Sequence, residues 1–342
     1  MKVWNFAIIG CGSIADFHAE AISQLSNARL VAVSSRSEQK AAAFASKVNS
    51  EWTSDYNELL QRADIDIVCI TTSSGSHATI GLAAIAAGKH VVIEKPLAMR
   101  TTDGAELVRA ARAANVKLSV ISQRRFEPQH QLVKQMLTSG ALGKLLLVEA
   151  SLPFYRSQDY YDSASWRGTI AEDGGALMNQ GIHSVDLLLW FAGSVQSVMG
   201  EIATQTHQME AEDMGLAIVK FEGGTLGTIM ASTSIQPGFQ ATMHLYGSLG
   251  TIKLEGSSIT YWHVRGHEQP QAEQEKSYGG VSDPRNLVAD YHRIQFADVI
   301  SAIEQDVTPL VSGADGVRAV ELVESIYASS VTGKRIDTFV EL

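Results

Sequence analysis

The sequence contains few of the residues that mark secreted, membrane-spanning or nucleic-acid-binding proteins. Its two cysteines, Cys11 and Cys69, are too few for a disulfide framework or a cysteine metal cluster. No apolar run approaches the roughly 20 residues that a membrane-spanning helix requires. Acidic residues outnumber basic ones by 37 to 27, and the formal net charge of −10 argues against a nucleic-acid partner.

The sequence also lacks the motifs of several catalytic classes. It contains neither His-Glu-x-x-His nor Cys-x-x-Cys, so no metal is expected, and no Gly-x-Ser-x-Gly turn indicates acyl transfer. The N-terminus starts with a strand-like pattern and lacks the charged-then-apolar order of a signal peptide. These absences predict a cytoplasmic protein with no membrane contact.

The chain of 342 residues is long enough for two domains, and its pattern changes near residue 123. Residues 1–122 alternate short apolar runs with helical stretches, which predicts βαβ units and a parallel sheet. The expected strands are Trp4–Ile9, Leu30–Val33, Ile65–Thr71, His90–Ile93 and Lys117–Ile121. Residues 123–342 form the second predicted domain. There, successive strand-like segments from Val195 to Val264 without intervening helices indicate an antiparallel sheet.

A glycine-rich turn follows the first expected strand and opens a helix. In Gly10-x-Gly12-x-x-Ala15 the first glycine permits a tight turn, the second permits close approach to a pyrophosphate, and alanine packs closely against the sheet. We therefore predict a dinucleotide site at this turn, including Ser13 and Ile14, with the pyrophosphate at the N-terminus of the helix.

The second expected strand ends in Ser34-Ser35-Arg36, where NAD-preferring sites usually carry an acidic residue. No carboxylate is present to repel a 2′-phosphate, Ser35 can donate a hydrogen bond, and Arg36 can bind the phosphate. The alternative is a solvated arginine at a helix start. We expect NADP(H) as the preferred coenzyme, with NAD(H) possible.

A hydroxyl-rich turn, Thr71 to His77, follows the next strand. At the carboxyl edge of a parallel sheet, Thr72, Ser73 and His77 would line the nucleotide crevice. The same residues could instead cap the helix that follows. The predicted coenzyme site further includes Glu94, Lys95 and Gln123.

Two segments carry candidate catalytic groups. Lys95, in Glu94-Lys95-Pro96, follows an apolar strand and so lies where ligands bind such sheets. Asn179 and His183 are four residues apart on a predicted helix from about Gly175 to Phe191 and therefore share one face. Asp186 lies near that face, where it could satisfy His183 structurally or orient its ring for catalysis. Hydride transfer to nicotinamide needs such proton-handling groups.

These segments together resemble the glucose–fructose oxidoreductase / inositol dehydrogenase / MocA (Gfo/Idh/MocA) family. The resemblance covers essentially the whole chain and includes Ala87-Gly88-Lys89-His90 and the C-terminal Thr332-Gly333-Lys334. It implies an α/β fold with an N-terminal Rossmann domain and a C-terminal α/β domain with a large, open, mostly antiparallel sheet. It also implies an NAD(P)-dependent dehydrogenase that acts on CH–OH groups.

The resemblance assigns roles residue by residue. It implies that Lys95 contacts the substrate hydroxyl and the nicotinamide ribose, and that His183 is the acid/base. Many members carry Asp four residues before that histidine, whereas this chain has Asn179, which leaves the proton to His183 and Lys95. Asn179 would then only hydrogen-bond the substrate. Trp166 and Arg167 match a Trp-Arg pair near the nicotinamide end of the coenzyme.

The segment from Tyr161 to His183 is similar to one branch of the family, which includes UDP-N-acetylglucosaminuronate 3-dehydrogenases and glycoside 3-dehydrogenases. The expected substrate is a sugar, sugar derivative or cyclitol with a secondary ring hydroxyl. Tyr155, Arg156, Tyr160 and Trp166 are candidate substrate-binding residues, although the loop residues Tyr155, Arg156 and Tyr160 could merely pack the loop.

Two alternatives remain at this stage: a non-catalytic dinucleotide- or sugar-sensing regulator, and a reductase of a non-sugar substrate such as biliverdin or a trans-dihydrodiol. The open sheet of the second domain would expose a broad face, and such faces are commonly buried by self-association. We therefore expect a homodimer or homotetramer.

Overall fold

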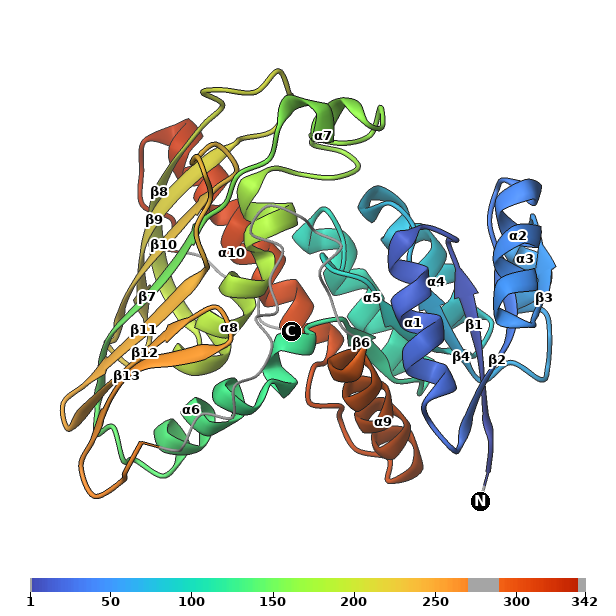
Figure 1. Ribbon diagram of the computed structural model, residues 1–342, viewed down its shortest axis with the longest axis horizontal. Coiled ribbons are helices and arrows are strands. Elements are labelled where there is room, and N and C mark those ends of the chain that lie inside the picture. The colour runs from blue at the N-terminus through green and yellow to red at the C-terminus, as the bar shows by residue number, and fades with distance from the viewer. Residues whose placement is uncertain (1, 270–288, 338–342) are drawn as a thin grey trace. The chain divides into compact units, whose positions relative to one another are not determined.

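The computed structural model describes residues 2–269 and 289–337, which fall into two compact units (Figure 1). The first unit holds the chain up to Gln123 and a later stretch that ends at Val317. The second holds the chain from Arg124 and the part of it that follows Val317. No helix among the described residues is both long enough and apolar enough to cross a bilayer.

The first unit contains a six-stranded sheet in which every neighbouring pair is parallel. Its strands are β1 (Trp4–Ile9), β2 (Ala28–Ser34), β3 (Glu51–Thr53), β4 (Ile67–Ile70), β5 (His90–Ile93) and β6 (Leu118–Val120). The strand order β3-β2-β1-β4-β5-β6 is that of a doubly wound dinucleotide-binding fold. The predicted Rossmann domain is confirmed.

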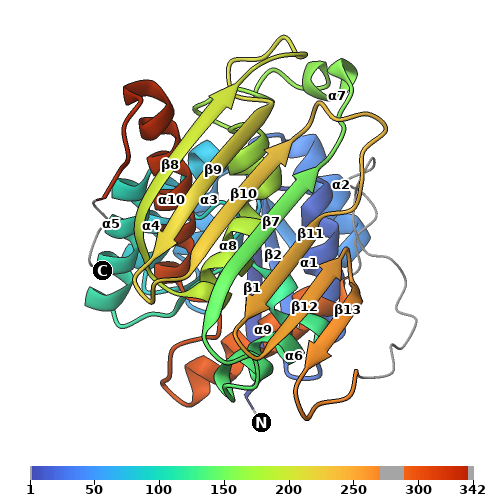
Figure 2. The same ribbon diagram turned by 90° about the vertical axis from the view of Figure 1, so that its left-hand side faces the viewer.

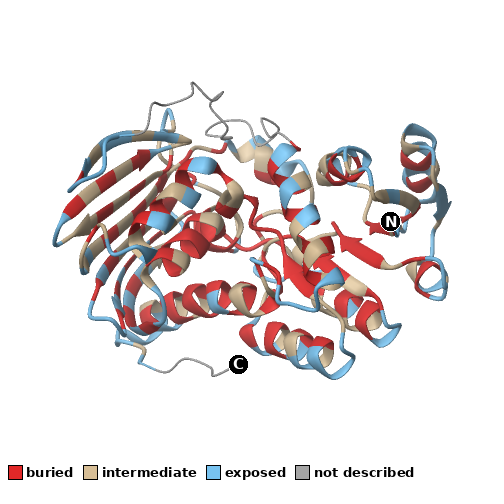
Figure 3. Cartoon of the chain, turned by 90° about the horizontal axis from the view of Figure 1, so that it is seen from below, coloured by how far each residue is buried: buried red, intermediate tan, exposed pale blue. Residues whose placement is uncertain are grey.

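Helices connect these strands and cover the sheet. They are α1 (Ser13–Ser23), α2 (Glu38–Val48), α3 (Tyr56–Leu60), α4 (His77–Ala86), preceded by the 3₁₀ turn η1 (Ser74–Ser76), and α5 (Thr101–Ala113). The central strands are continuous Val/Ile runs because both faces are covered, and all four residues of β4 are buried. Figure 3 shows buried residues concentrated in the strands and on the inner sides of the helices.

A later part of the chain returns to the first unit. It comprises α9 (Asp290–Glu304) and the first residues of α10 (Gly313–Thr332). The buried Gln295 amide donates to the Val120 carbonyl at 2.8 Å, and the Phe296 ring packs 5.7 Å from that of Phe6. The sequence pattern predicted domains of residues 1–122 and 123–342 and gave no sign of this return, because the contacts join residues far apart in the chain.

The second unit contains a seven-stranded sheet of order β13-β12-β11-β7-β10-β9-β8 (Figure 2). Its strands are β7 (Leu145–Pro153), β8 (Val195–Ala203), β9 (Met214–Phe221), β10 (Leu226–Ser232), β11 (Thr242–Gly247), β12 (Gly250–Glu255) and β13 (Ser258–Val264). The β7–β10 pair is parallel and the other pairs are antiparallel. The predicted mostly antiparallel sheet is confirmed.

Helical segments pack on one face of this sheet. They include α8 (Ile182–Ala192), which contacts β7, and the π-helical turn η3 (Ala176–Gly181), which contacts β9 and β10. The unit also contains η2 (Gln123–Phe126) at its start, α6 (Pro128–Thr138) and the short α7 (Gln158–Asp162). No described helix covers the opposite face (Figure 2), and β9 alternates buried and exposed residues accordingly.

Candidate active site

The glycine-rich turn forms the start of a dinucleotide cradle. Gly10 has a φ of 110°, and a Cβ there would lie 2.7 Å from the Thr71 carbonyl group, so no larger residue fits. A Cβ on Gly12 would meet no protein atom within 4 Å. Ser13 and Ile14 are the first residues of α1, whose N-terminus has no side-chain cap. Open space in front of uncapped helix amides fits a pyrophosphate.

The end of β2 supplies the residues expected around the adenosine ribose. Ser34 is buried and its carbonyl accepts from the Gly10 amide at 2.8 Å, which ties this strand end to the cradle. Ser35 is half-buried, whereas Arg36 is exposed. The described residues place no carboxylate at the predicted ribose position, since Ser34, Ser35 and Arg36 occupy it.

The hydroxyl-rich turn after β4 is held together by hydrogen bonds among its own residues. Ser76 Oγ donates to Thr72 Oγ1 at 2.7 Å and to the Ser73 carbonyl at 2.8 Å, and no side chain caps α4. The structure therefore does not support the capping alternative. His77 is fully buried, with Nδ1 2.8 Å from the Pro96 carbonyl oxygen and Nε2 3.3 Å from that of Thr72. Burial lowers the pKa of His77.

Lys95 lies directly beyond the carboxyl end of β5, as predicted. Its backbone amide donates to Glu94 Oε2 at 3.2 Å. The Glu94 side chain is buried in the first unit, where His18 Nε2 lies 2.8 Å from Oε1. Glu94 therefore belongs to a buried cluster, and its predicted contact with the coenzyme stays a prediction. Gln123, at the end of the unit's first stretch, is also buried.

The second unit presents Asn179 and His183 on a helix that is not regular. Residues Ala176–Gly181 form a π-helical turn and the α-helix begins only at Ile182. The prediction of one regular helix from about Gly175 is therefore wrong in its first turns, and the shared face of Asn179 and His183 stays a prediction. His183 is half-buried, and the Asn179 amide donates to Asp173 Oδ1 at 2.6 Å.

Glu212, which the sequence did not single out, fixes the start of the π-turn. Its backbone carbonyl accepts from the Ala176 amide at 2.8 Å and its Oε1 from the Leu177 amide at 2.8 Å. Tyr327 donates a further hydrogen bond to Oε1 at 3.0 Å. A Cβ on Gly175 would lie 2.1 Å from Glu212 Oε2, so glycine is required there. Burial raises the pKa of the Glu212 carboxyl to about 7.

Asp186 has a partner that the sequence did not predict. Arg125, in η2, donates to Asp186 from Nε at 2.9 Å and from Nη2 at 2.6 Å, and both side chains are buried. This bidentate guanidinium–carboxylate pair stabilises the negative charge of the buried Asp186. Pairing of Asp186 with His183 stays a prediction.

The loop after β7 gathers arginine and aromatic side chains. Buried Arg156 donates to Gln180 Oε1 at 3.0 Å, and Arg167 donates to the Tyr160 hydroxyl at 2.7 Å. The Arg167 guanidinium also lies over the rings of Tyr160 and Trp166, at 4.3 and 4.6 Å from their centroids. Tyr155 forms a β-bridge with Ser234. The loop is therefore packed, yet it presents cations and ring faces of the kind that bind sugars and anions.

A Rossmann sheet with this cradle, followed by a lysine at a strand end, defines an NAD-binding oxidoreductase. The chain belongs to the Gfo/Idh/MocA family. Residues 4–122 match the model of the oxidoreductase family with an NAD-binding Rossmann fold. Residues 130–253 match the model of the GFO/IDH/MocA C-terminal domain. The resemblance inferred from the sequence is confirmed.

The chain is similar to several members of the family. The structure of the WlbA dehydrogenase from Bordetella pertussis in complex with NADH and UDP-GlcNAcA is 31% identical, with a TM-score of 0.89 over 99% of both chains. Myo-inositol 2-dehydrogenase from Thermotoga maritima is 27% identical over 93% of both chains. Oxidoreductase P35 from Formosa agariphila is 32% identical over an alignment that covers 57% of this chain and 62% of that protein.

Proposed function

We propose that this protein transfers a hydride between a nicotinamide coenzyme and a secondary ring hydroxyl or ketone of a sugar, sugar derivative or cyclitol. The observation that carries the proposal is the likeness, over nearly the full chain, to a dehydrogenase bound to NADH and UDP-GlcNAcA. A pyranose that carries a carboxylate or a nucleoside diphosphate group is therefore the first substrate class to test.

The proposed chemistry divides the proton work between two side chains. His183 takes the hydroxyl proton during oxidation and returns it during reduction. Lys95 donates a hydrogen bond to the reacting oxygen and stabilises the negative charge that develops on it. The bound coenzyme supplies the acceptor for the hydride that leaves the carbinol carbon. Asn179 orients a neighbouring hydroxyl, and Tyr155, Arg156, Tyr160 and Trp166 hold the substrate.

The coenzyme site that we propose comprises the residues predicted from the sequence. These are Gly10, Gly12, Ser13, Ile14, Ser35, Arg36, Thr72, Ser73, His77, Glu94, Lys95, Gln123, Trp166 and Arg167. Because Arg36 stands where an acidic residue would favour NAD(H), we propose that NADP(H) binds more tightly and that NAD(H) also serves.

We further propose that the open face of the seven-stranded sheet mediates assembly into a homodimer or homotetramer. Met199, Leu216 and Ile218 are each about half or more exposed on this face (51%, 49% and 63%). They line a shallow hollow with Met230, bordered by Glu149, Glu201 and His244. An exposed apolar patch with a polar border is typical of a surface that a partner covers.

The test is turnover with NADPH and NADH over a panel of UDP-sugars, uronates, pyranosides, inositols and a trans-dihydrodiol. Lys95→Ala and His183→Ala should each lose several orders of magnitude in turnover while coenzyme binding, followed by fluorescence, stays intact. Exposed Lys40→Ala and His263→Ala serve as controls and should behave as wild type. Near-normal turnover in both active-site variants would contradict the assignment.

A further inference from the structure

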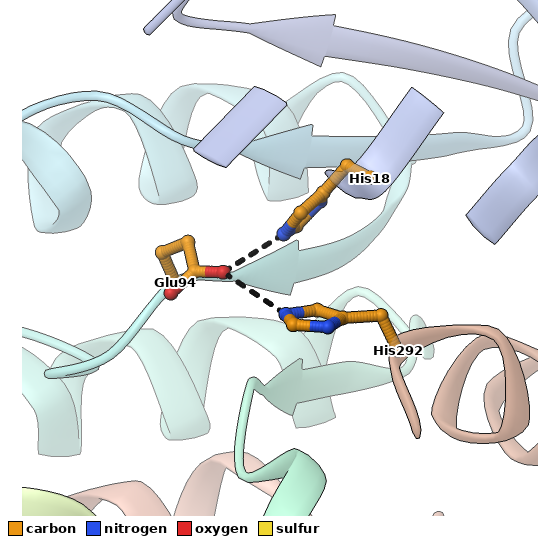
Figure 4. A group of neighbouring side chains, drawn as sticks. All are labelled: His18, Glu94 and His292. Atoms are coloured by element: carbon orange, nitrogen blue, oxygen red, sulfur yellow. Dashed lines mark hydrogen bonds and ion pairs between the residues drawn. The ribbon is translucent and has the colours of Figure 1, made fainter. Parts of the chain in front are cut away.

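A buried cluster lies behind the strand end that carries Lys95. It consists of His18 on α1, Glu94 at the end of β5 and His292 on α9 (Figure 4). Glu94 Oε1 lies 2.8 Å from His18 Nε2 and 3.8 Å from His292 Nε2. The three side chains are 0%, 8% and 1% exposed, in the order His18, Glu94, His292.

The distance between Glu94 and His18 identifies them as a hydrogen-bonded pair rather than as two ligands of one metal ion. Zinc sits about 2.0–2.2 Å from each nitrogen or oxygen ligand, which separates tetrahedral ligand atoms by roughly 3.3 Å. The separation of 2.8 Å between Glu94 Oε1 and His18 Nε2 is shorter and is that of a direct hydrogen bond. His18 therefore serves the carboxylate directly, whereas His292 Nε2, at 3.8 Å, packs near it without a hydrogen bond.

The cluster keeps a negative charge in the interior. Burial acts to raise the pKa of Glu94, but the contacts with His18 and His292 outweigh it and hold that pKa well below its usual value. An ionised carboxylate in an apolar core persists only where donors surround it. The structure thus maintains a charged group one residue from Lys95.

Both sides of Lys95 are anchored in the same unit. On one side, Glu94 Oε2 accepts from the Lys95 amide at 3.2 Å. On the other, the Pro96 carbonyl oxygen lies 2.8 Å from Nδ1 of buried His77. The main chain around the lysine is therefore fixed to α1, α4 and α9, of which α1 also carries the dinucleotide cradle at its N-terminus.

We propose that Glu94 is a positioning residue for Lys95, and that His18 and His292 hold it in place. This inference rests on the proposed role of Lys95 in the reaction. Displacing a reacting group by about 1 Å can cost on the order of 100-fold in rate, so a rigid mount for the lysine main chain has a direct catalytic effect. Glu94 itself touches neither substrate nor reacting atoms in this arrangement.

The experiment is a double-mutant cycle on the rate of hydride transfer, measured in single turnovers with saturating coenzyme. At saturating coenzyme, Glu94→Ala should slow transfer 10- to 100-fold in the wild-type background. In the Lys95→Ala background the same change should have almost no further effect. Glu94→Gln, whose amide oxygen can still accept from the Lys95 amide while its NH2 group faces His18 Nε2, should recover most of the rate. An equal slowing in both backgrounds would overturn the inference.

A matched pair elsewhere in the chain provides the control. Glu127 and His130 form another buried carboxylate–imidazole contact, with 3.2 Å between Glu127 Oε2 and His130 Nδ1, in the second unit. Glu127→Ala should lower thermal stability as Glu94→Ala does but leave hydride transfer unchanged. Equal slowing of hydride transfer in Glu127→Ala and Glu94→Ala would show that Glu94 acts only through overall stability. That result would overturn the inference.

Two further results separate the possible failures. If Glu94→Ala does not fold, His292→Asn carries the same cycle, and additivity with Lys95→Ala again overturns the inference. If Lys95→Ala itself turns over normally, the proposed function fails rather than the positioning role alone. One equivalent of zinc in the purified wild-type protein, lost in His292→Asn, would overturn the hydrogen-bonded cluster.

Discussion

Arg125 binds Asp186 through two hydrogen bonds of 2.9 and 2.6 Å, and both side chains are almost completely buried. Asp186 follows His183 by three residues on α8, so this pair anchors the helix that presents the proposed acid/base. The Arg125 guanidinium also lies 5.5 Å from the ring centroid of Trp190 on the same helix. The pair is thus a structural support of α8, which carries the proposed acid/base His183.

Removing one member of this pair should be costly. Arg125→Ala leaves a buried carboxylate without its main donor, and we expect a loss of about 3–5 kcal/mol in the free energy of unfolding. Arg125→Met combined with Asp186→Leu should recover much of that loss, because no buried charge remains. Urea unfolding measures both. A loss below about 1 kcal/mol in Arg125→Ala would contradict the structural role.

Glu212 should make stability depend on pH near neutrality. Its folded-state pKa of about 7 lies above the ordinary value of 4.5, so the unfolded chain releases this proton first as pH rises. Stability from this group is therefore greatest below pH 4.5 and falls by ~3 kcal/mol between pH 4.5 and 7. Glu212→Gln should flatten the difference between pH 5 and pH 8 in urea unfolding, whereas exposed Glu222→Gln should not. An unchanged pH slope in Glu212→Gln would count against the assignment.

Replacing the two glycines of the cradle by alanine should have different effects, on stability at Gly10 and on coenzyme affinity at Gly12. Gly10→Ala forces a side chain against Thr71 at a φ of 110°, and we expect a loss of about 1–3 kcal/mol in stability. Gly12→Ala meets no protein atom and has an allowed φ of −88°, so the protein should fold normally. Its new methyl group would instead occupy space beside the bound pyrophosphate, and coenzyme affinity should fall at least tenfold. Thermal unfolding and fluorescence titration distinguish these outcomes.

Arg36 should set the preference between coenzymes. Arg36→Ala removes the proposed partner of the 2′-phosphate, and NADPH affinity should fall about tenfold while NADH affinity stays constant. Arg29→Ala, an exposed arginine change in β2, is the matched control. Equal NADPH and NADH affinities in the wild type would show that Arg36 is only a solvated residue.

The open sheet face should determine the oligomeric state. Ile218→Glu adds a charge at the centre of the apolar patch, and we expect the assembly to dissociate into monomers in analytical ultracentrifugation. Val331, on α10, is even more exposed (85%) but lies outside this patch, so Val331→Glu should leave the assembly intact. A monomeric wild-type protein would contradict the proposed interface.

The sequence predicted those features that depend on local pattern. The bounds of β1 and β5 are as expected, because each is a short apolar run with a clear break at both ends. β3 was missed, since Glu51, Trp52 and Thr53 form a short edge strand without an apolar run. The helix α3 that follows is only five residues long and too short to show a period.

Local sequence pattern indicated the residues of the proposed site, but it indicated none of the residues that support them. Lys95 was recognised because it follows a buried strand, and His183 because it lies in an apolar helix. Glu212 and Arg125 reach the catalytic helix from distant parts of the chain, and no local spacing marks such a contact. The π-turn was not predicted for a related reason. Glu212 and Gly175 stabilise it, and the spacing of its apolar residues does not distinguish it from an α-helix.

A π-turn can be regarded as an α-helix with one inserted residue, and η3 therefore offers a simple route to altered specificity. Deleting Gln180, which lies between Asn179 and α8, would restore ordinary winding without changing the sequence of α8. Everything upstream of the deletion would then rotate by roughly 100° about the helix axis and shift by about 1.5 Å. A single-codon loss could thus redirect the substrate-orienting amide while sparing the histidine, a larger change of geometry than most point substitutions achieve.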